Sequence, residues 1–384
     1  MRKWALAVAL VAIAAPVSAG RPAVTHAVTV SQLAQMLDRV HHRWDGRLAK
    51  QISDMKLTER LSASRLARLQ TQLPGSQSRE ALLAIAGESA FLDLPADEIP
   101  SNPAPSTAAQ AALLAEASAF VSDTIDRLPS FTATRETTRF EGTATVISGR
   151  LQTEFFTLNL WRAPSAVNWE CPGEPKIGYR RLSIIDRTRV AVVYRHGHEL
   201  HALGEKGGEF ECPENSVSTT EEFGQVLAWI PGAIAQGKVT WSHWERGAAG
   251  LVAVFQYSTL APMKSAEPVA GRGEIALDPA NGTILRLTEV QSWSEREAGY
   301  NGNPGYDATV ECEREVDFGP VNIGGSVFYC PVHRVAIYRA PILWPRGSAP
   351  EIDAIYRQNG LAESPLLEYL NDVTFTGYRL YSAR

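Results

Sequence analysis

The sequence predicts an α+β protein in which a small helical bundle precedes a curved antiparallel β-sheet, a half-barrel with one or two covering helices. Apolar residues recur at helical spacing up to about residue 128 and alternate with polar residues from Phe131 onward. Two turn signals, Asn281-Gly282 and Gly324-Gly325, each separate two strand-like runs. The firm helix signal within the strand-rich part lies at 219–230, where overlapping capping boxes precede "FGQVLAWI".

Residues 1–19 have the three parts of a secretory signal peptide. Arg2 and Lys3 form a charged start, Trp4 to Ala15 an apolar stretch, and the segment ending at Ala19 a small-residue cleavage site. The apolar stretch is too short to cross a bilayer as a helix, and no later segment reaches about 18 uncharged apolar residues. We therefore expect cleavage near Ala19 and an exported, soluble protein, periplasmic or extracellular, without an integral membrane span.

Charge and short motifs exclude several classes of function. The formal charge of −5 becomes −7 when Arg2 and Lys3 leave with the signal, and no Lys/Arg run marks a nucleic-acid patch. The sequence has no G-x-S-x-G, phosphate-loop or dinucleotide-binding pattern. The "SDMK" segment at 53–56 matches S-x-x-K but lacks the companion motifs of penicillin-binding proteins. We expect no nucleic-acid partner and no cofactor.

The helical part and the sheet part are expected to be separated by a linker. Residues 20–92 should form the helical domain, because apolar stripes such as Leu33, Met36 and Leu37 recur at helical spacing. A Pro-rich linker at 93–106 then leads into a helix at 107–128 that should pack on the sheet. Residues 129–384 should form the antiparallel half-barrel domain.

The four cysteines are an even number in a chain that we expect to be exported, which favours disulfides. Cys171 and Cys212 both lie beside prolines in turn-rich segments that flank strand-like sequence. We therefore expect Cys171 to pair with Cys212 and Cys312 to pair with Cys330, with four free thiols as the alternative. No pair has C-x-x-C spacing, so a zinc knuckle is not supported.

The segment "YRHGHELHAL" resembles the opening of a binuclear metal site. His196, His198 and His201 have H-x-H-x-x-H spacing, but Leu200 stands where a metallo-β-lactamase-type site needs an aspartate. "HELH" is also one residue short of the H-E-x-x-H zinc-protease pattern.

Strand geometry favours a hairpin at this segment. A two-residue turn at His196-Gly197 would place Val193 opposite Leu200 and Val192 opposite His201. Successive side chains of a strand point to opposite faces, so His198 and His201 could not share a metal. We expect a hairpin tip and no metal site.

An aromatic cluster surrounds His243. "VTWSHWER" should place Trp241 and His243 on one strand face and Trp244 on the other. Aromatic rings with polar tips suit the wall of a ligand groove, and they equally suit a sheet core.

Six segments resemble, in the same order, an uncharacterised family of exported bacterial proteins. They are "LTERLS" (57–62), "SAFLDLPADEIP" (89–100), "LPSFTATRETTRFE" (128–141), "STTEEFGQVLAWI" (218–230), "VTWSHWER" (239–246) and "VDFGPVNIGGSVFYCPV" (316–332). The resemblance covers the chain from about residue 28 to the C-terminus and implies no particular activity. Family members often have an aliphatic residue where Cys330 stands.

The sheet part is more loosely similar to the half-barrel of periplasmic lipoprotein carriers and related sigma-factor regulators. The similarity lies in the consecutive hairpins, "ALDPANGTILRL" and the "FYCPV" strand. In those proteins helices cover a curved sheet around an apolar groove. The resemblance implies that the helix at 219–230 covers such a groove and that four of its side chains line or fill it. These are Phe223, Val226, Leu227 and Ile230.

Three hypotheses about function follow. The leading one is a non-enzymatic exported protein that binds a lipid, another apolar ligand or a protein partner in a sheet groove, with Trp241 and His243 among its candidate lining residues. The second is an exported hydrolase that uses His243 or the 196–201 histidines and would need a histidine and a carboxylate within hydrogen-bonding reach. The third is an envelope protein that uses its helical part as an interaction module.

Overall fold

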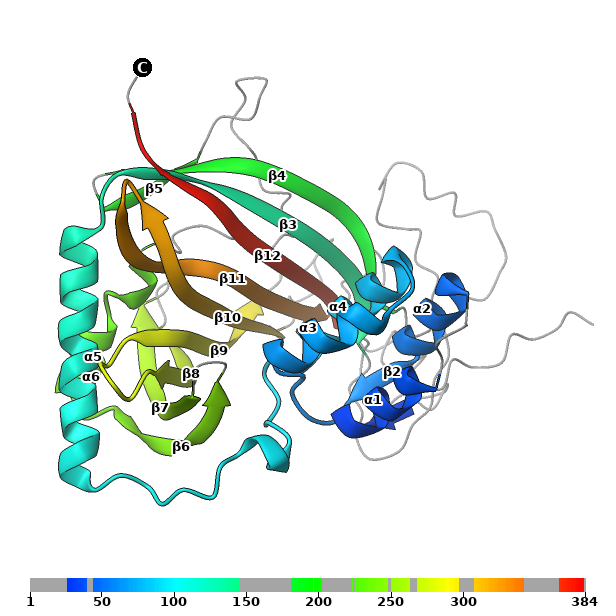
Figure 1. Ribbon diagram of the computed structural model, residues 1–384, viewed down its shortest axis with the longest axis horizontal. Helices are drawn as coiled ribbons and strands as arrows, with labels where there is room; N and C mark the ends of the chain where they lie inside the picture. The colour runs from blue at the N-terminus through cyan, green and yellow to red at the C-terminus, as the bar shows by residue number, and fades with distance from the viewer. Residues whose placement is uncertain are drawn as a thin grey trace, which may run out of the picture.

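The prediction of an α+β protein is confirmed at the level of fold class, because helices accompany a large antiparallel sheet (Figure 1). The computed structural model describes residues 26–39, 44–144, 181–195, 197–201, 223, 225–247, 250–262, 268–296, 307–341 and 366–382. No helix in these ranges is long and apolar enough to cross a membrane.

The first part of the chain folds as a helical unit, residues 26–94. Its elements are β1 (His26–Val28), α1 (Val30–Asp38), α2 (Asp45–Ser53), β2 (Met55–Leu57), α3 (Ala63–Gln72) and α4 (Ser76–Ser89). Thr29 caps α1 in a capping box with Gln32. The amphipathic stripes that the sequence shows meet in one core, which includes Leu33, Leu37 and Leu69. The short parallel pairing of β1 with β2 was not predicted, because three-residue strands carry no periodicity.

The linker passes along the sheet before it reaches the long helix. It contains the 3₁₀ turn η1 (Ala96–Glu98), and the carbonyl oxygen of Pro103 accepts a hydrogen bond of 2.9 Å from the indole Nε1 of Trp244. Helix α5 (Thr107–Arg127) follows, with the Ser106 hydroxyl as its N-cap.

The main sheet has ten strands. They are β3 (Phe131–Ala144), β4 (Ser183–Arg195), β5 (His198–His201), β6 (Val239–Gly247), β7 (Gly250–Pro262), β8 (Pro268–Leu277), β9 (Ile284–Arg296), β10 (Asp307–Ile323), β11 (Ser326–Pro341) and β12 (Leu366–Leu380). Their order in the sheet is β5-β4-β3-β12-β11-β10-β9-β8-β7-β6, with antiparallel neighbours throughout. The sheet is strongly curved, and its edge strands β5 and β6 do not pair with each other within the described residues, so it is open (Figure 1).

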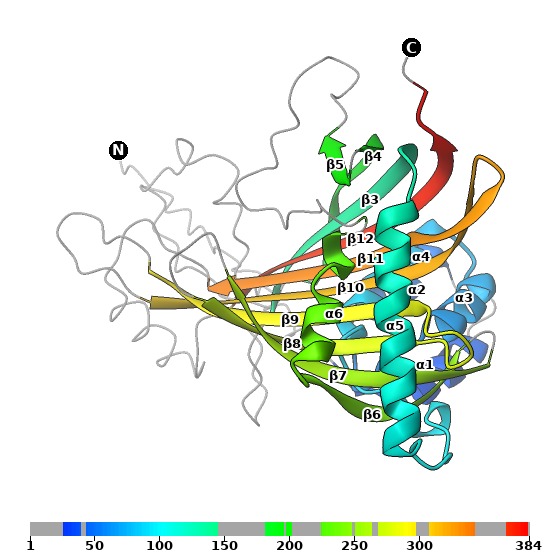
Figure 2. The same ribbon diagram turned by 90° about the vertical axis from the view of Figure 1, so that its left-hand side faces the viewer.

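Helices cover both faces of the sheet (Figure 2). On one face, the α5 face, Ala117 and Val121 of α5 pack over Phe255, Leu277 and Leu287. On the opposite face, the α4 face, Ala84 of α4 and Ala90 just after it pack over strand residues of the β4–β11 part of the sheet. These strand residues are Phe140, Val335, Ile337 and Leu370. The alternating strand sequences thus serve two separate cores.

The predicted hairpin turns are confirmed. Gly282 has φ of 69° at the β8–β9 turn, and Gly324 and Gly325 have φ of 63° and 93° at the β10–β11 turn. In the β4–β5 hairpin Val193 lies opposite Leu200 and Val192 opposite His201, as the spacing indicates. His196 itself lies outside the described residues.

The described part of the segment expected as a helix, 219–230, is not α-helical before Ile230. The 3₁₀ turn η3 (Gln225–Leu227) precedes α6 (Ile230–Ala235), and Pro231 lies in the first turn of α6. The expected helix stops at residue 230, before this proline, whereas in the structure the proline helps to start a helix. Its missing N–H has no intrahelical partner in a first turn, and its fixed φ suits the start of a helix. Residues 218–222 lie outside the described part of the chain.

The pairing of Cys312 with Cys330 is wrong. Both are free thiols, and Cys330 lies opposite Gly319, seven residues along β10 from Cys312. At about 3.3 Å per residue the two are about 23 Å apart along the strand, whereas a disulfide joins Cα atoms about 5.5 Å apart. Cys171 and Cys212 lie outside the described residues.

Candidate functional site

The four groove candidates near 219–230 lie inside the protein. Val226, Leu227 and Ile230 pack under α5 against the sheet. Phe223 packs among Phe131, Tyr194 and Phe375, with ring centroids 5.2–6.1 Å apart. These side chains fill the space over the α5 face, so they are not exposed to a ligand there.

A β-bulge changes the expected arrangement around His243. Trp241 lies opposite Phe255 and His243 opposite Val254, which leaves Ser242 as the extra residue. Trp241 and Trp244 therefore share the α5 face, with ring centroids 4.9 Å apart. The prediction that Trp241 and His243 share a face is wrong, because the inserted residue reverses the alternation.

The hairpin histidines lie only in part within the described residues. The register of β4 and β5 places His198 and His201 three residues apart on β5, with His198 opposite Arg195 and His201 opposite Val192. No group of three or more His, Cys, Asp or Glu side chains within the described ranges is arranged to hold a metal ion.

The structure instead gathers charged side chains on the α4 face into an ionic cluster. Cross-strand neighbours bring Arg286 of β9 next to Asp317 of β10, and Asp317 next to His333 of β11. Arg60 joins from the loop between β2 and α3. The full cluster comprises Arg60, His243, Glu245, Glu274, Arg286, Glu315, Asp317, His333 and Asp372.

Glu245 holds one end of the ionic cluster together. Its carboxylate accepts two hydrogen bonds from Arg286, of 2.8 and 2.9 Å, and a third from Arg60. His243 Nε2 lies 3.2 Å from Glu245 Oε1. Burial acts to raise the pKa of Glu245, but the hydrogen bonds from His243 and Arg286 and the nearby cationic charges hold it well below its usual range. Glu245 therefore ties the helical unit to β6 and β9 as a permanent anion.

His333 lies between two carboxylates at the other end. Its Nε2 is 2.9 Å from Asp372 Oδ2, and its Nδ1 is 3.4 Å from Asp317 Oδ2. Burial acts to lower the pKa of His333, but hydrogen bonds to Asp317 and Asp372 raise it to about 10. His333 is therefore a cation at neutral pH rather than a proton acceptor.

Glu315 lies between these two ends with an incomplete set of contacts. Only 9% of the residue is exposed, yet its Oε2 makes no hydrogen bond and lies 3.7 Å from Arg286 Nε, which makes none either. Burial and the charge of Asp317 raise the pKa of Glu315 to about 7, against the lowering effect of Arg286, Arg60 and His333. A buried carboxyl oxygen without a partner requires an explanation, since most such atoms are satisfied.

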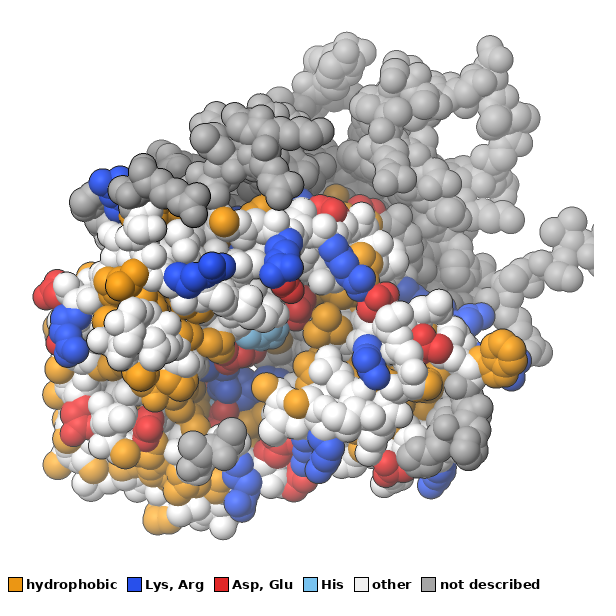
Figure 3. Space-filling view, turned by 45° about the horizontal axis from the view of Figure 1, so that its top comes forward, with side chains coloured by type: hydrophobic (Ala, Val, Ile, Leu, Met, Phe, Trp, Pro, Cys, Tyr) orange, Lys and Arg blue, Asp and Glu red, His pale blue; other side chains and the backbone are white. Residues whose placement is uncertain are grey.

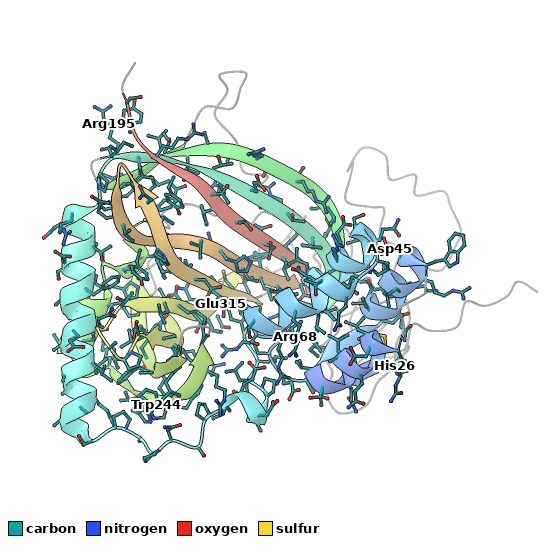
Figure 4. All side chains as sticks on the ribbon, viewed as in Figure 1. His26, Asp45, Arg68, Arg195, Trp244 and Glu315 are labelled. Atoms are coloured by element: carbon teal, nitrogen blue, oxygen red, sulfur yellow. The ribbon has the colours of Figure 1, made fainter. Side chains whose placement is uncertain are left out.

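The ionic cluster lies at a hollow in the surface. Figure 3 shows this hollow, with a histidine and both acidic and basic side chains in it. Figure 4 places Glu315 near the middle of the molecule, between the helical unit and α5. His333 and Asp317 keep 30% and 28% of their side chains exposed, so solvent reaches two of the groups beside Glu315.

Comparison with known proteins gives no family for this chain. No protein-family model matches it, no curated protein matches it, and no solved structure matches it. The geometry of the ionic cluster is therefore the basis for a functional argument.

The sequence contains a signal for this cluster, although His243 is the one predicted site residue that belongs to it. In "ECEREVD" acidic residues recur at every second position, Glu311, Glu313, Glu315 and Asp317, which places four carboxylates on one strand face. Buried strands rarely carry such a row, so it indicates a polar site or a network of ion pairs. Their partners come from other strands and from the helical unit, which spacing alone does not show.

A second acidic contact lies where α4 covers this face. Glu88 of α4 lies beside Glu368 of β12, and Glu368 accepts a hydrogen bond of 2.8 Å from Arg339. Burial, followed by the charge of Glu368, raises the pKa of Glu88 to about 8. The contact between α4 and the sheet therefore depends on a carboxyl group that stays protonated.

We expect the Glu88→Gln variant to be more stable than the wild type at pH 9, by on the order of 5 kcal/mol, and to be within about 1 kcal/mol of it at pH 5. The folded chain holds the Glu88 proton up to pH about 8, whereas the unfolded chain loses it near pH 4, so wild-type stability falls as pH rises between these values. Urea unfolding at both pH values measures the difference. Glu80→Gln, on the exposed side of α4, is the control and should show no such pH dependence.

Proposed function

We propose that this protein is an exported binding protein that takes up a polar ligand in the hollow on the α4 face. The observation that carries the proposal is Glu315, a buried carboxyl group whose Oε2 lacks a hydrogen-bond partner beside a solvent-accessible hollow. The charged side chains around it are held in place by ion pairs from five strands and the helical unit. Convergent polar groups in a concave site are typical of ligand binding.

The proposal gives the two faces of the curved sheet different roles. In it the sheet acts as an open half-barrel whose α5 face is closed by α5 and α6, because Val226, Leu227 and Ile230 are core residues there. The lipid-binding role implied by the likeness to lipoprotein carriers has no support from these buried residues. Export and membership of the exported bacterial family remain predictions from the sequence.

Native mass spectrometry of the full chain, purified gently from the cells that make it, tests the proposal. We expect a small polar adduct on the wild type, its loss in Glu315→Leu, and its retention in Glu311→Gln, an exposed position on the same strand. Lipid extraction of the same sample should give no stoichiometric lipid. A bound lipid, the absence of any adduct, or an adduct that survives Glu315→Leu would contradict the proposal.

An exported hydrolase is a second candidate, favoured by one observation at the bulge. The Ser242 hydroxyl lies 2.9 Å from His243 Nδ1, and His243 Nε2 lies 3.2 Å from Glu245 Oε1. The three side chains thus form a Ser–His–Glu chain of contacts, the arrangement by which a base activates a nucleophile and an acidic residue orients the base. The acid is also bound by Arg60 and Arg286, which weakens its effect on the histidine.

Hydrolysis of p-nitrophenyl acetate tests this candidate. If Ser242 is the nucleophile, the wild type hydrolyses the ester above the blank rate and Ser242→Ala loses about 100-fold or more, as expected for loss of a nucleophile. Ser258→Ala, on the neighbouring strand β7, is the matched control. A wild-type rate equal to that of the Ser242→Ala variant would exclude the candidate.

A further inference from the structure

We infer that the ligand carries a positively charged amine or guanidinium group, and that this group binds at Glu315 and Asp317. The inference rests on the proposed function, since it specifies the chemistry of the ligand that enters the hollow. Three features of the ionic cluster support it: its charge balance, the positions of its unused acceptors, and the engagement of its cations.

The ionic cluster has more acidic than basic groups. Five carboxyl groups face three cationic side chains, so full ionisation leaves two negative charges in excess, and a protonated His243 would still leave one. The acids are Glu245, Glu274, Glu315, Asp317 and Asp372, and the cations are Arg60, Arg286 and His333. An excess of negative charge in a partly dry site favours a cation as the missing component.

The unused hydrogen-bond acceptors lie on Glu315 and Asp317. Glu245 already accepts bonds from two arginines, and Asp372 lies 2.9 Å from a ring nitrogen of His333. Among the described residues, Glu315 Oε2 finds no hydrogen-bond partner, while the hydrogen-bonding contact of Asp317 is a long one of 3.4 Å to His333, and Asp317 is 28% exposed. Glu315 and Asp317 are two residues apart on β10 and share a strand face, so an ammonium or guanidinium group has acceptors side by side.

An anionic ligand fits this site poorly. The two terminal nitrogens of Arg286 both bond to Glu245, and Arg60 bonds to the same carboxylate. Arg286 Nε, which makes no hydrogen bond, is directed toward Glu315 at 3.7 Å. An anion would have to displace these pairs and would meet the excess acidic charge.

Binding of a cation at Glu315 should depend on pH. The groups that face Glu315 are Asp317 on its own strand, Arg286 of β9, His333 of β11 and Arg60 of the helical unit. The pKa values of Arg286 and His333 are raised, so both stay charged around neutral pH, and Glu315, with its pKa raised to about 7, is the group that titrates. A cation needs the ionised carboxylate, so binding should release a proton and strengthen as pH rises through about 7.

Calorimetric titration with butylammonium chloride tests the inference. Sodium butyrate and 1-butanol serve as the anionic and the neutral control ligand of similar size. We expect millimolar-range binding of butylammonium at pH 8, roughly tenfold or more weakening at pH 5.5, and no comparable binding of the other two probes. Glu315→Gln should weaken binding and remove its pH dependence, while Glu311→Gln should bind as the wild type does. Circular dichroism of both variants verifies that they are folded.

The outcomes separate this inference from the proposed function. If butyrate or butanol binds in preference to butylammonium, and Glu315→Gln abolishes that binding, the ligand is not a cation. The proposed polar site in the hollow would still stand. Binding of butylammonium that is equal in the Glu315→Gln variant would overturn the position of the cation. The absence of binding by all three probes, together with the absence of a polar adduct on the native protein, would overturn both.

Discussion

Replacing Glu245 with glutamine is expected to lower the free energy of unfolding by about 3–5 kcal/mol, because it breaks the charge-assisted hydrogen bonds of two largely buried arginines. Arg60 and Arg286 both bond to this carboxylate, and both are largely buried. The contact also joins the helical unit to two strands of the sheet. Urea unfolding at pH 7, followed by tryptophan fluorescence, measures the change.

Glu274→Gln is the matched control for this prediction. Glu274 also lies near Arg286, at 3.9 Å, but 30% of its side chain is exposed. Unlike Glu245, it does not link Arg286 to Arg60 within the described residues. We expect it to change the free energy of unfolding by less than about 1 kcal/mol. Similar effects of the two variants would show that Glu245 does not organise the ionic cluster.

Gly273→Ala is expected to destabilise the fold by about 3 kcal/mol, through a clash rather than a lost contact. A Cβ atom at Gly273 would overlap the carbonyl oxygen of Thr288 on the neighbouring strand and approach the hydroxyl of Tyr257. Tyr257 donates a hydrogen bond of 2.7 Å to that same oxygen, so the backbone of β9 is held in place and cannot easily move away.

Gly232→Ala is also a glycine-to-alanine change, but it is expected to stabilise the fold. Gly232 lies within α6, and nothing is close to the Cβ that alanine would add. Alanine should stabilise the protein there by about 0.5–1 kcal/mol, since it favours the helix and restricts the unfolded chain. Thermal unfolding of both variants gives the comparison, and equal changes would contradict the steric explanation for Gly273.

The parts of the fold that local sequence determines could be predicted. The turns at Gly282 and at Gly324-Gly325 follow from residues that accept positive φ, and the register of the β4–β5 hairpin follows from a two-residue turn. Helix α5 begins and ends within one residue of the expected 107–128, because the Ser106 cap and Pro129 are local signals.

The parts that depend on distant contacts could not be predicted. The bulge at Ser242 has no local signature, yet it moves Trp244 to the other face and leaves His243 next to Glu245. The ionic cluster joins residues from Arg60 to Asp372, which the order of strands alone brings together. The row of acids that ends at Asp317 was visible, but the positions of its partners were not.

The place of β12 in the sheet has a consequence for how the chain can fold. The last strand, Leu366–Leu380, lies between β3 and β11, so until it is present the strands β3–β5 and β6–β11 have no pairing to each other. The helical unit and each strand block can form from neighbouring residues, but the junction closes a loop of more than two hundred residues. Such long-range pairing is slow and leaves two unpaired strand edges exposed in the meantime. Pairing of β12 with β3 and with β11 is therefore the step that unites the two blocks into one sheet.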